Sequence, residues 1–169
     1  MSGLVFHHAH RVAYAECTVG DHVYYGRYLD LLEAARGEFF RQLGTPLLAW
    51  QAQDVLFPVI ECSLRYKFPA RYDDVLAITV WPTMAEKIRL NFSHRILNQN
   101  GVLILEAETF HVCTGLNEKP KRLPGELILQ LEAYLPIPSH PAESTRHKMR
   151  DSQKNAAPGA GDFVSNRST

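Results

Sequence analysis

The sequence predicts an α+β fold in which one long helix packs against an antiparallel β-sheet. Near the start of the chain, apolar residues recur with the period of a helix. Four later segments read as strands, and two of them, residues 56–68 and 87–99, alternate apolar and polar residues as half-buried strands do. The connections between these segments are short and contain Gly, Pro, Asn and Asp. Consecutive strands joined in this way favour an antiparallel sheet.

The length and charge of the chain limit the class of protein. Its 169 residues suit one domain, and 46% of them are hydrophobic, so a proper core can form. Lys plus Arg and Asp plus Glu number 18 each, so no strong net charge attracts nucleic acid or an anionic membrane. We therefore expect neither as a partner.

The three cysteines, Cys17, Cys62 and Cys113, lie far apart in the sequence. Their odd number argues against a disulfide framework, and their spacing argues against a zinc site. No signal peptide opens the chain, and no apolar run approaches the ~20 residues of a membrane span. We expect a soluble, cytoplasmic protein with reduced thiols and no metal site.

A strand, a polar hinge and a helix are expected in the first part of the chain. Residues 4–15 are expected to form the strand and residues 16–27 the hinge. The helix is predicted from apolar residues at helical spacing, which are Tyr28, Leu31, Leu32, Ala35, Phe39 and Leu43. Gly44 is placed to end it, and Pro46 prevents its continuation. Since the helix is apolar around much of its circumference, we expect other structure to wrap it.

Four long strands are expected after a connection at residues 45–54. They are residues 56–68, 75–85, 87–99 and 102–116. Pro82 indicates a bulge or an edge, and residues 98–101 suit a hairpin turn. A short helix is expected to begin near Pro124. The long helix can lie in the concave face of this meander, and a second copy of the chain can join its exposed edge.

The composition changes from about Pro136 onward. This segment is rich in Pro, Ser, Asn, Gly and Ala and has few large apolar side chains. It cannot bury enough apolar surface to offset the entropy lost on ordering. We therefore expect one domain over residues 1–135 and a disordered tail over residues 136–169.

Three stretches of the sequence together resemble a known family. They are "VAYAECTVGDHVYYGRYLDLLEAARGEFF", "RYKFPARYDDVLAI" and "ETFHVCTGLNEKPKRLP", in this order. The chain is similar over residues 11–135 to the hot-dog-fold acyl-CoA thioesterases of the 4-hydroxybenzoyl-CoA thioesterase type. The resemblance implies the hot-dog fold, in which an antiparallel sheet wraps around one long central helix.

The resemblance also implies an activity and a way of achieving it. Members hydrolyse thioesters of coenzyme A without a metal or an organic cofactor. They work as homodimers or homotetramers, with active sites at the subunit interface. A carboxylate near the start of the central helix acts as general base or nucleophile, and backbone N–H groups at that helix start polarise the thioester carbonyl.

The matching of residues within the hinge predicts an unusual site. Thr18 stands where the usual enzyme carries its catalytic Asp, and Tyr25 stands where many members have His. Because a Thr hydroxyl is not a general base near neutral pH, the carboxylate must come from elsewhere. We expect Asp21 or Glu33 to direct a water, His22 and Tyr25 to assist, and the backbone amides around Tyr25 to Tyr28 to hold the carbonyl.

Each of these residues has a plainer interpretation, which stays open. Asp21 also suits a turn or a helix cap. His22 also suits an ordinary position in a loop, and Tyr25 also suits packing. Glu33 also suits an ion pair with Arg36 on the next helical turn. His94 and His111 are expected to be satisfied core or interface histidines.

The basic turn before the last helix is the candidate site for coenzyme A. It contains Lys119, Lys121 and Arg122. The resemblance implies that cations at about this place bind the nucleotide end of the substrate, although a solvated turn has the same composition. Because Thr18 replaces the usual acid, a non-catalytic hot-dog protein that binds an acyl thioester, or a regulatory or assembly module, is the alternative function. A hot-dog dehydratase lacks support, since no Asp and His pair has the required spacing.

Overall fold

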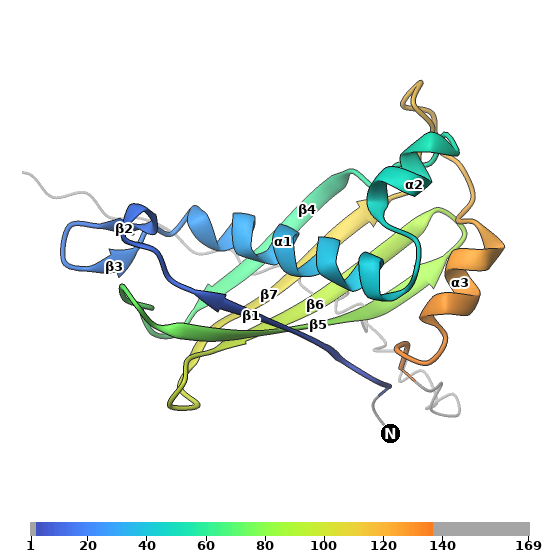
Figure 1. Ribbon diagram of the computed structural model, residues 1–169. Helices are drawn as coiled ribbons and strands as arrows, with labels where there is room; N and C mark the ends of the chain where they lie inside the picture. The colour runs from blue at the N-terminus through green and yellow to red at the C-terminus, as the bar shows by residue number, and fades with distance from the viewer. Residues whose placement is uncertain (1–2, 137–169) are drawn as a thin grey trace, which may run out of the picture. The chain divides into compact units, whose positions relative to one another are not determined.

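In the computed structural model, which describes residues 3–136, one sheet wraps around one long helix (Figure 1). The elements are, in chain order, β1 (Phe6–Arg11), a 3₁₀ turn η1 (Tyr14–Glu16), β2 (Cys17–Thr18), β3 (His22–Val23), α1 (Arg27–Gln42), α2 (Leu47–Ala52), β4 (Val59–Tyr66), β5 (Val75–Glu86), β6 (Arg89–Leu97), β7 (Leu103–Val112) and α3 (Gly125–Leu131). Except for Pro136, the predicted tail lies outside the described residues. None of the helices described here is long and apolar enough to cross a membrane.

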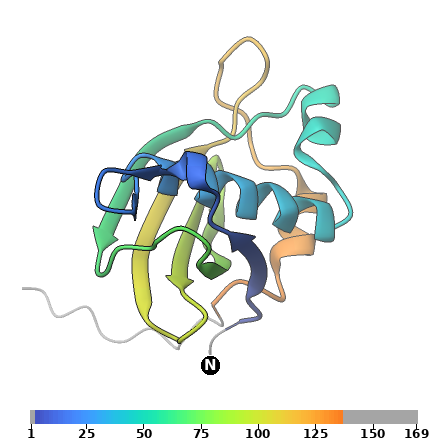
Figure 2. The ribbon, with the colours of Figure 1, turned by 60° about the vertical axis from the view of Figure 1, so that its left-hand side comes forward.

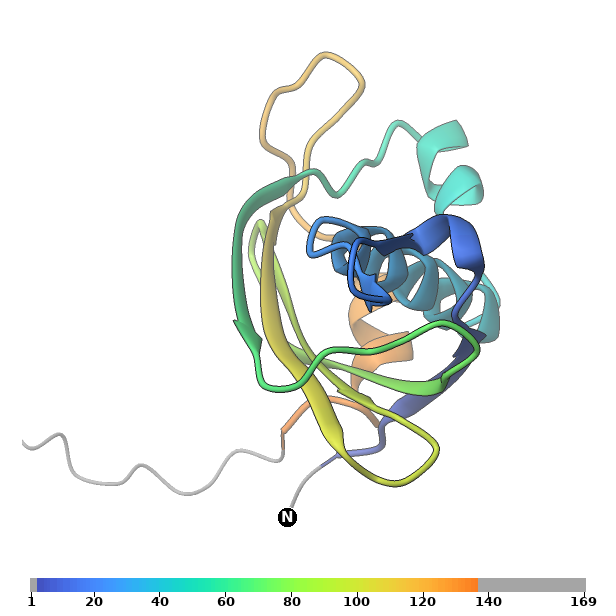
Figure 3. The same ribbon diagram turned by 90° about the vertical axis from the view of Figure 1, so that its left-hand side faces the viewer.

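The main sheet has five antiparallel strands in the order β1-β5-β6-β7-β4. It curves around α1, which lies along its concave face (Figure 3). The small β2–β3 hairpin lies beside the start of α1, outside the main sheet (Figure 2). This is the hot-dog arrangement that the resemblance implies, so the predicted fold is confirmed.

The core forms where the apolar stripe of α1 packs on the central strands. Phe39 and Phe40 each pack against Phe92 of β6, with ring centroids 6.2 Å apart in both pairs. The inward faces of the strands add Leu76, Ile78, Val80, Leu90, Ile96 and Leu105. Burying one large apolar side chain contributes about 1.5–3 kcal/mol, so this contact between helix and sheet is a main source of stability.

Helix α1 ends where the sequence signals place its end. Leu43 donates its N–H to the Phe39 carbonyl over 3.0 Å, and Gly44 follows with a φ of 92°. A positive φ favours glycine, so the predicted C-terminal glycine is confirmed. Two other local predictions are confirmed as well. The pairing of β5 with β6 shifts register between Pro82 and Met84, and α3 begins directly after Pro124.

The structure differs from the prediction in three places. The first strand is shorter than expected, because residues 14–16 turn as a 3₁₀ helix. The expected connection at residues 45–54 contains α2, which the buried ring of Trp50 anchors. The four long strands are not a simple meander: β4 pairs with β7, and residues 67–74 cross the end of the sheet to reach β5. This pairing sets Leu64 opposite Ala107 on the inward face.

Strand β4 is a free edge of the sheet. All of its residues are exposed or half-buried. Ile60 and Tyr66, on the side predicted to be apolar, stay 50% and 49% exposed. An edge strand carries unpaired N–H and C=O groups along its length. The edge therefore offers a place for the second copy that the sequence predicts.

Candidate active site

The predicted polar hinge folds into the β2–β3 hairpin that leads into α1. Gly20 and Asp21 form its turn with φ values of 87° and 60°, a backbone conformation that Gly and Asp adopt more readily than most residues. At its base the Glu16 carboxylate accepts hydrogen bonds from His10 Nε2 over 2.9 Å and from the Ala13 amide over 2.7 Å. Glu16 therefore holds the hairpin in place.

The crossing segment, residues 67–74, fastens this hairpin to α1. Val23 donates its amide to the Ala70 carbonyl over 2.9 Å. The Ala70 amide in turn donates to the Tyr28 hydroxyl oxygen over 3.1 Å. Tyr28 is buried, and burial raises the pKa of its hydroxyl, so it stays neutral and able to accept this bond. Hairpin, crossing segment and helix start therefore form one fastened unit.

The start of α1 presents free backbone amides. Gly26 is the N-cap residue, and no side chain caps the helix. The N–H groups of Tyr25 and Gly26 donate to no acceptor within residues 3–136. The dipole of a helix also favours negative charge at its start. These two amides can therefore stabilise an oxygen that becomes negative during a reaction.

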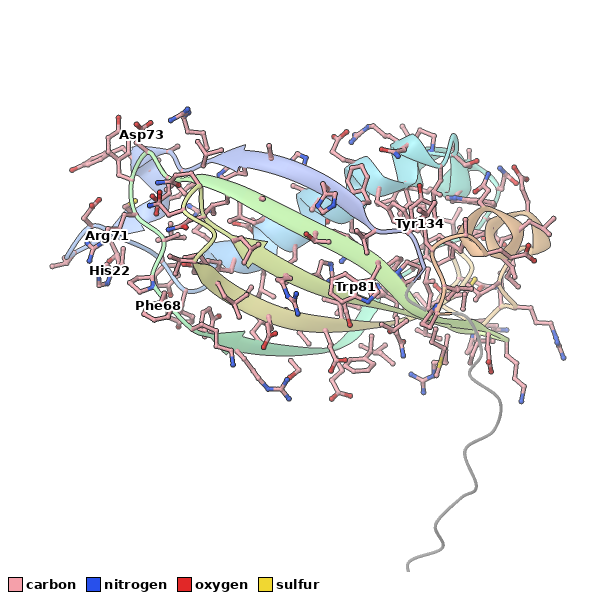
Figure 4. The ribbon with its side chains drawn as sticks, turned by 90° about the horizontal axis from the view of Figure 1, so that it is seen from below. His22, Phe68, Arg71, Asp73, Trp81 and Tyr134 are labelled. Carbon is pink, nitrogen blue, oxygen red and sulfur yellow. The ribbon has the colours of Figure 1, made fainter. Side chains whose placement is uncertain are left out.

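A pocket of about 240 Å³, which we call the helix-start pocket, opens beside these amides. It is lined by His22, Val23, Tyr25, Tyr28, Tyr66, Lys67, Phe68 and Pro69. Tyr66 donates its hydroxyl to the Tyr25 carbonyl over 3.1 Å, which links β4 to the residues before the helix. His22 and Phe68 lie at the same end of the molecule in Figure 4. The lining contains a histidine, a lysine and three tyrosines but no carboxylate.

The structure brings only two of the predicted catalytic residues into the helix-start pocket. His22 and Tyr25 line it. Thr18 is exposed on the hairpin, outside the lining. Asp21 is also outside: one of its carboxylate oxygens lies 3.4 Å from the Tyr72 amide and the other 4.0 Å from Arg71 Nη1. Asp21 thus occupies a turn, as its plainer interpretation expects.

Glu33 lies elsewhere on α1. It is six residues beyond Arg27, which places it roughly 9 Å further along the helix axis. Glu33 lines a second pocket of about 370 Å³, the mid-helix pocket, which also contains Arg36. The expected ion pair between Glu33 and Arg36 is wrong, because Glu33 faces solvent whereas Arg36 is buried and only 8% exposed.

Two buried histidines lie near Arg36. His111 donates from Nδ1 to the Phe57 carbonyl over 2.9 Å and accepts at Nε2 from the Thr109 hydroxyl over 3.0 Å. Burial, with the nearby Arg36 charge, lowers the pKa of His111 to about 4 and that of His94 to about 3. Neither ring nitrogen of His94 has a hydrogen-bond partner among the described residues. The prediction of a satisfied core histidine is confirmed for His111, whereas His94 lies in the core as predicted but without a well-formed hydrogen bond among the described residues.

The basic turn lies far from the helix start within one chain. It is next to α2, at the end of α1 opposite the β2–β3 hairpin (Figure 1). Lys121 is held by Asp54, with its Nζ 2.8 Å from the carboxylate and 2.7 Å from the carbonyl oxygen. This hydrogen bond lowers the pKa of Asp54. Lys119 and Arg122 are both exposed, and neither forms an ion pair within residues 3–136.

Several residues of these pockets were not predicted as site residues. Lys67 and Phe68 reach the helix-start pocket because the crossing segment passes over it, and Tyr66 reaches it from the end of β4. Lys67 is shared with the outer face of the sheet, where its Nζ lies 3.5 Å from Glu106. Arg36 had a usable signal, since it falls four residues after Leu32 on the apolar stripe of the helix.

Comparison with known proteins agrees with this architecture. The sequence model of the family described as the Thioesterase-like superfamily matches residues 12–132 of this chain. The acyl-CoA thioester hydrolase YbgC of Escherichia coli is 33% identical over 133 residues, which cover 78% of this chain and 99% of that protein. The crystal structure of the hypothetical protein TT1821 from Thermus thermophilus superposes with a TM-score of 0.72 at 30% identity, covering 76% of this chain and 98% of that one. Slr0204, a 1,4-dihydroxy-2-naphthoyl-CoA thioesterase from Synechocystis, shares the fold. Its TM-score is 0.70 at 22% identity, and the match covers 75% of this chain and 95% of that one.

Proposed function

Since the chain belongs to the thioesterase-like superfamily, we propose that it hydrolyses acyl-CoA thioesters, releasing free CoA and a carboxylic acid, with the reacting carbonyl at the start of α1. The observation that carries this placement is the pair of unpartnered amides, of Tyr25 and Gly26, beside the helix-start pocket. The narrower resemblance, to the 4-hydroxybenzoyl-CoA type, stays a prediction.

The amides act on the oxygen of the thioester carbonyl. When the oxygen atom of a water attacks the carbonyl carbon, the carbonyl oxygen takes up negative charge. Two fixed N–H groups and the helix dipole stabilise that charge without rearrangement. As the tetrahedral intermediate collapses, the C–S bond breaks, the CoA sulfur leaves as a thiolate, and the proton removed from the water returns to solvent or to that thiolate.

We propose Glu33 as the carboxylate that takes the proton from water. Asp21 already meets Arg71 and the Tyr72 amide, whereas Glu33 lines a pocket and has no ion-pair partner within the described residues. A carboxylate in hydrogen-bond reach of the attacking water can contribute about 10²–10⁴-fold to the rate. His22 and Tyr25 line the helix-start pocket and are proposed to assist there.

The separation of Glu33 from the helix start favours a homodimer or homotetramer as the active unit. Within one chain, roughly 10 Å along the helix axis separates Glu33 from the nearer amide, that of Gly26, too far for both to act on one carbonyl. Leu29 and Glu33 lie on one exposed face of α1, and the edge strand β4 is uncovered. A second copy joined at β4 is proposed to bring the Glu33 of one chain to the amides of the other.

We also propose that the basic turn binds the nucleotide end of CoA. Lys119 and Arg122 are free to bind the phosphates of CoA, and Lys121 can share its charge between Asp54 and a phosphate. The proposed reaction needs neither a metal nor an organic cofactor. The three free cysteines support a reducing compartment such as the cytoplasm.

The alternative is a non-catalytic protein that binds acyl thioesters, or a regulatory or assembly module. It is favoured by one observation: no carboxylate lines the helix-start pocket. The two functions separate in one assay, in which purified protein is mixed with aliphatic and aromatic acyl-CoAs and free thiol is measured. Thiol release that is lost in Glu33→Gln supports hydrolysis. Binding of CoA thioesters without any release would establish the alternative.

A further inference from the structure

Arg36 is a buried cation for which the described chain provides no anion. Its side chain is 8% exposed, and it forms neither a salt bridge nor a hydrogen bond within residues 3–136. Burial lowers the pKa of the guanidinium, and the opposing effects of exposed Glu33 and of Cys62 offset it only in part. An arginine stays charged in proteins, so removing it from water without a partner is costly. Such a group points to a ligand or a partner that supplies the missing charge.

The surroundings of Arg36 are apolar on one side and polar on the other. The mid-helix pocket has walls from α2 and the segment before β4, including Leu47, Leu48, Phe57 and Pro58. Behind Arg36 lie the two buried histidines, and His94 has no partner for either nitrogen. A pocket with apolar walls and one charged group at its base suits a molecule with an apolar body and one anionic end.

We propose that the mid-helix pocket holds the acyl group of the substrate and that Arg36 binds a carboxylate at its far end. The preferred substrates would then be CoA monothioesters of dicarboxylic acids. The reaction in this inference is the proposed hydrolysis. The preference for dicarboxylic substrates depends only on Arg36.

The geometry of α1 fits this arrangement. Glu33 and Arg36 line the same pocket, so whichever copy supplies the water-directing carboxylate also supplies the arginine. Three residues separate them, which is roughly 4.5 Å along the helix axis. A thioester carbonyl beside Glu33 would therefore direct its acyl chain past the next turn of the helix, toward the guanidinium.

The chemistry of the ligand follows from the shape and burial of the guanidinium. Its planar fork matches the two oxygens of a carboxylate, which it can bind through two parallel hydrogen bonds. A phosphate of CoA would bring more charge and a larger hydration shell into a pocket with apolar walls. The carboxylate of a short or medium dicarboxylic chain suits the site better.

The first test compares matched substrates. Glutaryl-, adipoyl- and suberoyl-CoA are each assayed against the fatty acyl-CoA of the same chain length, by release of free thiol. We expect the native protein to prefer the dicarboxylic member of each pair. Arg36→Met should lower kcat/KM on the dicarboxylic member at least about 30-fold more than on its partner, because one side of a buried charge pair is lost. Arg36→Lys keeps the positive charge but not the planar guanidinium, so its kcat/KM on the dicarboxylic member should lie between those of the native protein and Arg36→Met.

The matched control is Arg41→Gln, on the same helix. Arg41 is exposed and pairs with Glu38, so its loss should leave both substrate series unchanged. Hydrolysis of both series without preference, or an equal loss on both in Arg36→Met, would overturn the inference and leave the hydrolase function standing.

The second test uses stability and does not depend on turnover. If a ligand supplies the anion for Arg36, the charge is uncompensated in the ligand-free protein. Arg36→Met then removes an uncompensated charge, and the melting temperature without ligand should rise or stay the same. Free glutarate or adipate should then stabilise the native protein and not Arg36→Met. If no acyl-CoA is hydrolysed, this binding result alone decides the inference. A lower melting temperature, together with dissociation of the native oligomer in Arg36→Met, would show that a second copy supplies the anion and would refute it.

Discussion

The start and the middle of α1 differ in the chemical groups that they present. Beside the helix-start pocket, two amides have no acceptor within residues 3–136 and no carboxylate lines the pocket, whereas the mid-helix pocket has a carboxylate and a buried arginine. The two pockets lie on one rigid helix, so their separation within a chain is fixed. The difference between them underlies our proposal that one copy of this chain holds each chemical group and that two copies complete the site.

The largest effect is expected from removing the carboxylate of the mid-helix pocket. Glu33→Gln should lower kcat by about 10²–10⁴-fold, because the water loses its base. Asp21→Asn should change kcat little, since Asp21 lies in a hairpin turn. Steady-state kinetics on one good acyl-CoA substrate checks both. A severe loss in Asp21→Asn with an active Glu33→Gln would reverse the assignment of the base.

The role of the Tyr25 amide can be tested by comparing two substitutions, one of which removes the backbone N–H and one of which keeps it. Tyr25 is the second residue of a turn closed by the Arg27 amide and the Tyr24 carbonyl, at 2.8 Å, a position that accepts proline. Tyr25→Pro removes both ring and N–H, whereas Tyr25→Ala removes only the ring. We expect kcat of the proline variant to be about 10²–10³-fold below that of the alanine variant. Equal rates would exclude this amide from the oxyanion site.

The buried histidines behind the mid-helix pocket should make stability depend on pH. The pKa values of His94 and His111 fall from 6.5 to about 3 and about 4 on folding, so the unfolded chain binds protons more readily. Their contribution to the free energy of unfolding is present above pH 6.5 and is lost as the pH falls toward 4. The slope approaches about 1.4 kcal/mol per pH unit for each imidazole.

Thermal denaturation across that pH range measures this dependence. His94→Leu removes one of the two groups and two unpartnered nitrogens, so its stability should fall less steeply with falling pH than that of the native chain. Equal slopes for the two proteins would mean that His94 is not buried as a neutral group.

The smallest effect is expected where the crossing segment is fastened over the helix-start pocket. Tyr28→Phe leaves the Ala70 amide without its acceptor and should reduce the free energy of unfolding by about 1–3 kcal/mol. Hydrogen exchange should accelerate at Ala70 and Val23, which this bond helps to hold, while the middle of α1 keeps its protection. Unchanged exchange at both amides would show that the segment is held by other contacts.

Much of the fold follows from local patterns in the sequence. The stripe of α1, its terminal Gly44 and the bulge near Pro82 are set by periodicity and by the special backbone preferences of two residue types. Helix α2 escaped prediction because it has only six residues, and its main anchor is the buried ring of Trp50. The pairing of β4 with β7 joins strands remote in sequence, and no local signal distinguishes it from a hairpin with β5.

The site was less accessible to prediction than the fold. His22, Tyr25 and Glu33 were predicted from their types and their places near the helix start, and each lines a pocket. Phe68 lines the helix-start pocket only because of the topology of the crossing segment. The place of Arg36 on the apolar stripe was a usable signal, but an arginine on a helix is usually exposed, so only the structure with the sheet in place establishes its burial.

The free edge of β4 has a consequence for how activity should scale. If the amides of one copy work with the Glu33 of another, then a single copy in dilute solution lacks a complete site. The rate per chain would then fall when the protein is diluted below the dissociation constant of the dimer and recover on concentration, by mass action. An exposed strand would in this way tie catalytic output to the amount of protein that a cell makes.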